Sequence, residues 1–308
     1  MRPVISFNSL SVNTSLKENA EKNHYFIVTA DDLGYSPERD RGIIDAYNEG
    51  IVTRASLLIN GYSRATAVKL AKEHGLALGI HINLTEGRAV NVTEEHNTLL
   101  AEDKPFFRGK FGFREAFSRG EIHISHIKNE IEAQITEFIK QVGYIPNHVD
   151  GHQHIHVLPE ISRIIAQMMN GYSLRQVRIP FEAQLSSWFE GNATFYQQVF
   201  QNAKAAKEIY GNYGIRSPSF IGVSLMGINM NVERIIHTYQ KAVMNNRQAP
   251  TICELMVHPG YPCVTGYGGC GEGPDDFACS HERQHELNIL CDRTLKGRLN
   301  DFNVTFTS

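Results

Sequence analysis

The sequence contains little of several features that would assign a protein to a class. It has one tryptophan and five cysteines among 308 residues, and its formal net charge is only −3. No apolar run approaches the roughly 20 residues that span a bilayer, so we expect no membrane segment. The small net charge gives no electrostatic reason to expect nucleic acid or an anionic membrane as a partner. With 42% hydrophobic and 20% charged residues, the composition is that of an ordinary soluble globular protein.

An export signal is also missing. The first 23 residues lack the apolar core of a signal peptide, so we expect a disordered or loosely attached extension over 1–23. The cysteines all lie in the last fifth of the chain. Their odd number, together with the missing signal, predicts reduced thiols in a cytoplasmic protein. Residues 24–308 are expected to form one domain.

Strand and helix patterns alternate from residue 25 onward. Seven strands are expected, over 25–30, 52–59, 76–80, 144–149, 176–179, 219–223 and 251–257. Helices are expected from Pro37 after the capping residue Ser36, over 63–74, 127–142, 159–170, 193–210 and 232–244, and after Ser280. The segment 83–122 carries too little periodicity to assign, and connections of such length are often functional.

Repeated strand–helix units predict parallel strands joined by right-handed crossovers. Seven or so units favour a TIM-like (β/α) barrel over an open sheet. The placement of polar residues agrees, because they follow the expected strands at the ends where barrel enzymes carry their chemistry. These residues are Asp31, Asp32, His81, His152, Arg178 and His258.

Two adjacent carboxylates, Asp31 and Asp32, follow the first expected strand. One can hold a metal ion while its neighbour accepts a proton from water, which is the minimal equipment for metal-assisted hydrolysis. Two aspartates before a helix are also common as a simple cap, and His81 alone would more often be a hydrogen-bonded core histidine. The pair is informative only together with the other imidazoles.

Alternate positions of the run HVDGHQHIH, residues 148–156, carry four histidines and Asp150. An extended backbone would place these five side chains on one face, which is costly to bury unless some of them bind a metal. The run therefore predicts a metal site, with His152, His154 and His156 all open as ligands on this reasoning.

Two further groups follow later strands. Glu254 and His258 share one face of the last expected strand, so the carboxylate is expected to orient the imidazole. Arg178 lies near the end of the fifth expected strand, and an arginine beside a metal would suit an anionic substrate.

The combination of these blocks resembles the YdjC-like carbohydrate deacetylases, a family related to the polysaccharide deacetylases. The match runs in the family's order from about residue 25 to 295, and the RxxEL motif at 283–287 is also similar. The matching blocks are TADDLG (29–34), GIHINLT (79–85), HVDGHQHIH (148–156), RIP (178–180) and MVHPG (256–260). The resemblance implies a distorted (β/α) barrel and removal of acetyl groups from N-acetylated sugars, including chito-oligosaccharides.

Carried over residue by residue, the resemblance implies one divalent metal ion per chain, held by Asp32, His81 and His152. Magnesium and zinc are the first expectations for this ion, and manganese, iron and cobalt also suit such ligands. Asp31 becomes the catalytic base, and His258 becomes the candidate general acid.

Five more residues receive roles at the expected site. Arg178 and Asn83 are assigned to substrate binding. Asp150, His154 and Glu254 are expected to support the metal ligands or to replace one of them.

Other classes stay open at this stage. The same site would serve hydrolysis of another amide or of a phosphate ester, since metal-activated water is indifferent to the group attacked. A catalytically idle sugar-binding protein is the third interpretation. Such a protein would be free to lose any of the five residues Asp31, Asp32, His81, His152 and His258, all of which are present. The expected partner is a small N-acetylated sugar, and the sequence leaves a homodimer open.

Overall fold

The computed structural model describes residues 24–93, 96–102, 104–183, 185–244 and 250–308. The expected N-terminal extension over 1–23 lies outside the described residues. Within the described ranges, every helix is too short or too polar to cross a bilayer.

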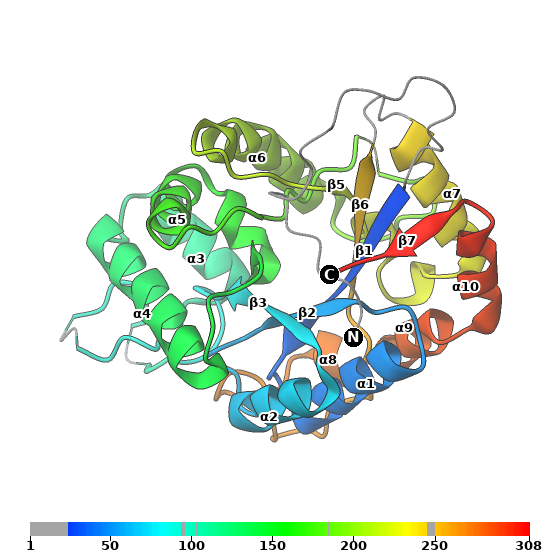
Figure 1. The fold of residues 1–308 in the computed structure, drawn as a ribbon. Helices are drawn as coiled ribbons and strands as arrows, with labels where there is room; N and C mark the ends of the chain where they lie inside the picture. The colour runs from blue at the N-terminus through cyan, green and yellow to red at the C-terminus, as the bar shows by residue number, and fades with distance from the viewer. Residues whose placement is uncertain (1–23, 94–95, 103, 184, 245–249) are drawn as a thin grey trace.

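Parallel strands form the centre of the molecule, and helices surround them (Figure 1). Six strands follow the order β4-β3-β2-β1-β6-β5, and β7 pairs with β1. All of these pairs are parallel. The strands are β1 (His24–Leu33), β2 (Arg54–Leu57), β3 (Ala77–Ile82), β4 (Val149–Gly151), β5 (Ser219–Ile221), β6 (Thr251–Val257) and β7 (Val304–Phe306).

The two edges of the curled sheet are joined by single bridges. Val149 of β4 pairs with Val177, and Gln176 pairs with Arg216, which lies shortly before β5. The segment around residue 177 therefore stands where one further barrel strand would run. The sheet is a distorted α/β barrel, as the sequence predicted.

Two of the expected strands differ from the structure. The strand expected over 144–149 is wrong in position, because β4 begins only at Val149. Tyr144 and Ile145 are 40% and 45% exposed, so their apolar character does not mark a buried strand. The strand expected over 176–179 is reduced to the isolated bridges described above.

Local capping signals fix many helix ends. The Ser36 side chain accepts the Arg39 amide hydrogen at the start of α1, and left-handed Gly75 and Gly143 end α2 and α4. The unassigned segment 83–122 contains α3. The helices are α1 (Pro37–Asn48), α2 (Arg64–His74), α3 (Gly109–Ser118), α4 (Ile124–Val142), α5 (Pro159–Gly171), α6 (Ala193–Asn212), α7 (Val232–Met244), α8 (Asp276–Cys279), α9 (Glu282–Leu290) and α10 (Arg293–Asn300).

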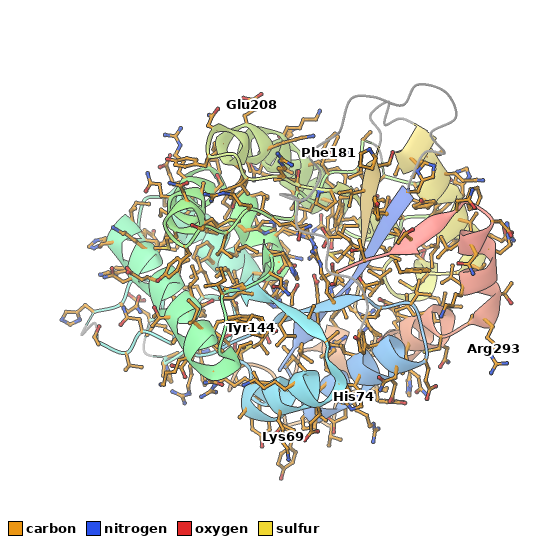
Figure 2. The ribbon with its side chains drawn as sticks, in the orientation of Figure 1. Lys69, His74, Tyr144, Phe181, Glu208 and Arg293 are labelled. Atoms are coloured by element: carbon orange, nitrogen blue, oxygen red, sulfur yellow. The ribbon has the colours of Figure 1, made fainter. Side chains whose placement is uncertain are left out.

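The helices bury apolar stripes against the barrel and turn polar side chains outward. In α4, Ile127, Ile131 and Ile135 are buried at helical spacing. Figure 2 shows Lys69 on α2 and Arg293 on α10 pointing away from the fold. The polar residues at the strand ends are therefore exceptional, because they are buried inside this shell.

Helix α1 lies unusually close to the loop after β6. A Cβ atom added to Gly42 would lie 2.4 Å from the Cα atom of Gly260, so the two backbones are in direct contact. Only a glycine at position 42 allows this approach. The contact fixes the loop that begins with His258.

We expect Gly42→Ala to lower the free energy of unfolding by about 1–3 kcal/mol, because the new methyl group meets backbone that cannot move aside. Gly297→Ala in α10 is the matched control, since its Cβ would meet nothing within 4 Å. The control should be neutral or stabilising by up to about 1 kcal/mol. Urea unfolding of both variants measures the difference, and equal stability would contradict the backbone contact.

Candidate active site at the carboxyl ends of the strands

The polar residues predicted from the sequence gather around one cavity at the carboxyl ends of the strands. The cavity has a volume of about 200 Å³. Six of its lining residues are Asp31, Asp32, His81, His152, His154 and His258. All six side chains are buried, with exposures of 8% or less.

Both adjacent aspartates reach this cavity because β1 is irregular at its end. Successive residues of a regular strand point to opposite faces. Here the register with β2 shifts between Ala30 and Leu33, and Asp32 has a left-handed backbone with φ of 65°. An irregularity of this kind re-aims side chains, and it lets Asp31 and Asp32 line the same cavity.

A buried carboxylate on α1 holds the turn that follows. Asp40 accepts hydrogen bonds from the Gly34 amide at 2.6 Å and from the Ser63 hydroxyl at 2.5 Å. The end of β1, the start of α1 and the start of α2 are thereby tied to one side chain. The sequence reasoning did not identify Asp40.

Two imidazole nitrogens converge on the Asp32 carboxylate and complete a trio of candidate ligand atoms. The Asp32 Oδ1 atom lies 3.5 Å from His81 Nε2 and 3.1 Å from His152 Nδ1. One ligand atom from each residue lies within 4.8 Å of the others. This trio is the set that the resemblance implied.

Each of the two imidazoles carries a carboxylate on its far nitrogen. His81 Nδ1 lies 2.7 Å from Asp150 Oδ1, and His152 Nε2 lies 2.9 Å from Glu86 Oε2. Metal-binding histidines almost always have such a partner, which fixes the tautomer and turns the free nitrogen toward the ion. The donor set and its supports therefore fit a divalent metal.

Electrostatics at the trio favour a cation. Burial alone would lower the pKa of His152, but hydrogen bonds and charges from Asp32 and Glu86 outweigh it and raise this pKa to about 10. Burial would likewise raise the pKa of Asp32, yet the neighbouring His152 holds it well below its usual value. A positive charge between these carboxylates is stabilised, whether it is a proton or a metal ion.

The histidine run does not have the extended form expected from its alternation. Only 149–151 is strand, and His152–Val157 forms a short 3₁₀ segment with left-handed backbone at Gln153 and His154. The prediction of one shared face is therefore wrong. His154 lines the cavity outside the converging trio, and the His156 Nε2 atom lies 3.0 Å from the Arg178 carbonyl oxygen.

Behind Asp31 lies a fully buried guanidinium. Arg178 donates to both carboxylate oxygens of Asp31, at 2.6 and 2.7 Å. It also lies 3.1 Å from Asp150 Oδ2 and donates to Glu254 Oε1 at 3.0 Å. Asp31, Asp150 and His81 form a second grouping of candidate ligands, but Arg178 contacts both of its carboxylates and already supplies them with a positive charge.

This network determines the charge of its acids. Burial raises the pKa of Asp31 to about 6, although Arg178 works in the opposite direction. Burial would also raise the pKa of Glu254, but Arg178 and Arg54 outweigh it and lower this pKa to about 2. The pKa of Asp31 thus lies close to neutral pH, while Glu254 stays ionised.

Three residues lie elsewhere than their expected roles suggested. Arg178 contacts carboxylates rather than open cavity, and Glu254 contacts Arg178 rather than His258. The Asn83 side chain is enclosed, where its Oδ1 atom accepts the amide hydrogens of Thr85 and Glu86. Asn83 therefore shapes the turn that points Glu86 toward His152.

Glu86 is a second residue, besides Asp40, that was not predicted from the sequence. Its signal was the Asn-x-x-Glu spacing after the third strand, in which a capping asparagine precedes a carboxylate by one turn. The surrounding segment had no periodicity, so this signal had no predicted helix or strand to support it.

His258 is held by its backbone on both sides. Its amide donates to Glu286 of α9 at 2.6 Å, and its carbonyl accepts from Arg39 of α1 at 2.8 Å. The imidazole Nε2 lies 3.9 Å from Asp31 Oδ2, and the ring packs edge-on against Phe277. Burial holds the pKa of His258 well below its usual value.

Fold and site together define an α/β-barrel protein with an enclosed carboxylate–imidazole centre at the carboxyl ends of its strands. Comparison with known proteins supplies the family. The YdjC-like protein family model matches residues 25–301. The chain therefore belongs to the YdjC-like family.

Individual relatives agree with this assignment. A carbohydrate deacetylase of Mus musculus is 41% identical over 278 residues, covering 89% of this chain and 90% of the relative. A chitooligosaccharide deacetylase of Serratia marcescens is 32% identical over 144 residues, covering 45% and 53%. A crystal structure from Enterococcus faecalis V583 superimposes with a TM-score of 0.71 at 22% identity, covering 93% of this chain and 97% of the other. This last match shows a shared fold.

The Asp40 carboxylate generates a pH-dependent prediction. Burial raises its pKa to about 7 from 3.8, against the effect of its hydrogen bonds to Ser63 and Gly34. The folded state then binds this proton more tightly than the unfolded chain, so stability is present at low pH and falls as the pH rises through about 4 to 7. Asp40→Asn lacks this component.

We therefore expect the stability of wild type relative to Asp40→Asn to fall by at least about 1 kcal/mol between about pH 5 and about pH 8. Urea unfolding of both proteins at the two pH values measures the change. Parallel pH profiles would show that Asp40 titrates alike in the folded and unfolded chains.

Proposed function

We propose that this chain is a metal-dependent carbohydrate deacetylase that removes acetyl groups from N-acetylated sugars, with chito-oligosaccharides among the candidate substrates. The main observation in support is that ligand atoms of Asp32, His81 and His152 converge. Each of the two imidazoles also has a carboxylate at its other ring nitrogen. The names of the related proteins support the sugar and the acetyl group.

Asp32, His81 and His152 would hold one divalent ion through one carboxylate oxygen and two imidazole nitrogens. Three protein ligands are typical of a catalytic rather than a structural metal site. When bound, the ion supplies polarisation of the acetamide carbonyl and a lowered pKa of water. Mixed carboxylate and imidazole ligands suit zinc, and manganese, iron, cobalt or magnesium are further candidates.

Asp31 acts as the base in this proposal. Its carboxylate lies next to Asp32 in the cavity, and the two-point contact with Arg178 fixes its orientation. A base works best when its pKa lies near the working pH, and burial raises the pKa of Asp31 to about 6. Asp31 can therefore take a proton from water and release it again within one turnover.

His258 delivers the proton to the departing amine. Its Nε2 atom lies 3.9 Å from Asp31 Oδ2, so a small shift would let the proton that Asp31 takes from water pass to the imidazole. Because burial lowers the pKa of His258, its protonated form gives up the proton readily. Without this proton, the tetrahedral adduct of water and acetamide would revert by losing the attacking water rather than the sugar amine.

The remaining polar residues support these groups. Asp150 fixes His81, and Glu254 fixes Arg178, which in turn orients Asp31. Arg178 is fully buried and its positive charge is paired with carboxylates. It therefore does not favour a phosphate-ester substrate, as an arginine open to the cavity would. Asn83 supports the site through the turn that carries Glu86.

Asp31→Asn should keep the metal but lose at least about a hundredfold in turnover, because an amide cannot accept the proton. The experiment measures acetate release from N-acetylated mono- and oligosaccharides with metal-loaded protein, after chelation and after metal add-back. Metal content is measured in parallel. Activity of the variant within a few-fold of wild type would remove Asp31 as the base.

Release that survives complete chelation would contradict metal dependence. Absence of release from every sugar by metal-loaded wild type would contradict the deacetylase function itself. His152→Ala serves as the metal-free reference, since it removes one of three ligands and should bind the ion far more weakly.

Glu86→Gln should weaken metal binding by about 10–100-fold, because His152 loses the carboxylate on its far nitrogen. Glu272→Gln is the matched control, since Glu272 accepts a hydrogen bond from the neighbouring Gly87 amide and, among the described residues, none from a histidine. Titration with zinc, in competition with a chromogenic chelator, measures both affinities. Equal affinities in the two variants would mean that Glu86 does not support the ligand.

A further inference from the structure

Two imidazoles in the cavity, those of His154 and His258, make no hydrogen bond to the described part of the chain; His258 already has a proposed role, and His154 has none. His154 is 6% exposed and lines the cavity together with the candidate ligands. Its Nδ1 atom is enclosed without a partner, and within the described ranges its Nε2 atom makes no hydrogen bond to the protein. The other histidines of the run, His148, His152 and His156, each make a hydrogen bond. Buried polar groups are normally paired, so an unpaired one inside a cavity indicates a missing ligand group.

The backbone is strained in order to present this ring. Gln153 and His154 have φ values of 52° and 61°, a conformation that residues other than glycine rarely adopt. Arg114 of α3 donates to the Gln153 carbonyl at 2.9 Å and so holds the strained turn in place. Strain of this kind persists where the surrounding structure enforces it, and it is concentrated at functional sites.

The ring is also fixed from the side. Tyr196 of α6 contacts it edge-on, with ring centroids 5.9 Å apart, and His156 lies behind it at 6.5 Å. Its orientation is therefore set before any ligand arrives. None of these contacts satisfies a ring nitrogen.

His154 is separate from the candidate metal site. It does not belong to the trio whose ligand atoms converge, although it lines the same cavity. The part of the substrate that reaches it must lie next to the acetamide. In an N-acetylated sugar the neighbouring groups are hydroxyls, which both donate and accept hydrogen bonds.

We propose that His154 is a specificity-determining residue that hydrogen-bonds one hydroxyl of the sugar ring bearing the acetamide. This inference rests on the proposed deacetylase function. A site built to pair with a hydroxyl discriminates strongly against analogues that lack it, because the buried protein group is then left unpaired. His154 thereby selects hydroxylated rings over simple acetamides.

The test crosses two variants with a substrate series. His154→Phe keeps the ring volume without nitrogens, and His154→Asn tolerates the left-handed backbone better than other replacements. The substrates are N-acetylglucosamine and its monodeoxy analogues, each lacking one hydroxyl. Metal content, thermal unfolding and sugar binding by calorimetry accompany kcat/KM.

We expect His154→Phe to lose about 10–100-fold in kcat/KM on N-acetylglucosamine while it retains the metal. One deoxy analogue should be equally poor for wild type, and the variant should no longer distinguish that analogue from the parent sugar. Met226→Leu, an apolar change in the same cavity, should keep the wild-type discrimination.

Two results would overturn the inference. One is loss of metal from both His154 variants, which would make His154 a ligand. The other is an equal loss on every substrate, the critical deoxy analogue included, which would indicate a structural role. Absence of turnover and binding by metal-loaded wild type with all these sugars would instead overturn the proposed function.

Discussion

The rest of the structure depends on the contacts of one buried guanidinium group. Arg178 joins Asp31 of β1, Asp150 of β4 and Glu254 of β6, all of them enclosed. Without this cation, Asp31 would lose both of its hydrogen bonds to the guanidinium, and breaking a buried pair of this kind typically costs about 3–5 kcal/mol. Arg178 also belongs to the segment that bridges the two edges of the barrel. The same segment therefore both closes the sheet and orients Asp31 in the site.

The site divides its positive charge between two places. Arg178 occupies the first permanently and neutralises the inner acids. The second lies between Asp32 and Glu86, where the raised pKa of His152 shows how strongly the carboxylates stabilise a cation. Asp31 stands at the boundary, oriented by the first charge and adjacent to the second. This separation explains how two neighbouring aspartates serve different roles, one as candidate ligand and one as candidate base.

The sequence predicted those features that short-range chemistry determines. Ser36 and Gly75 marked helix ends because capping involves only neighbouring residues. Asp31, Asp32, His81 and His258 were placed at one end of the barrel because parallel strands share a direction. The left-handed turn at His154 could not be predicted, since no glycine marks it and the surrounding packing enforces it.

The pairing of β7 with β1 has a consequence for how the chain acquires its shape. His24 pairs with Val304 and Phe26 with Phe306, so the strand that carries both aspartates is flanked by nearly the last described residues. Contacts between such distant segments form slowly, because a very long loop must close first. The pairing of β1 with β7 can form only after a segment about 280 residues later in the chain has been made, so we expect it to be a late step of folding.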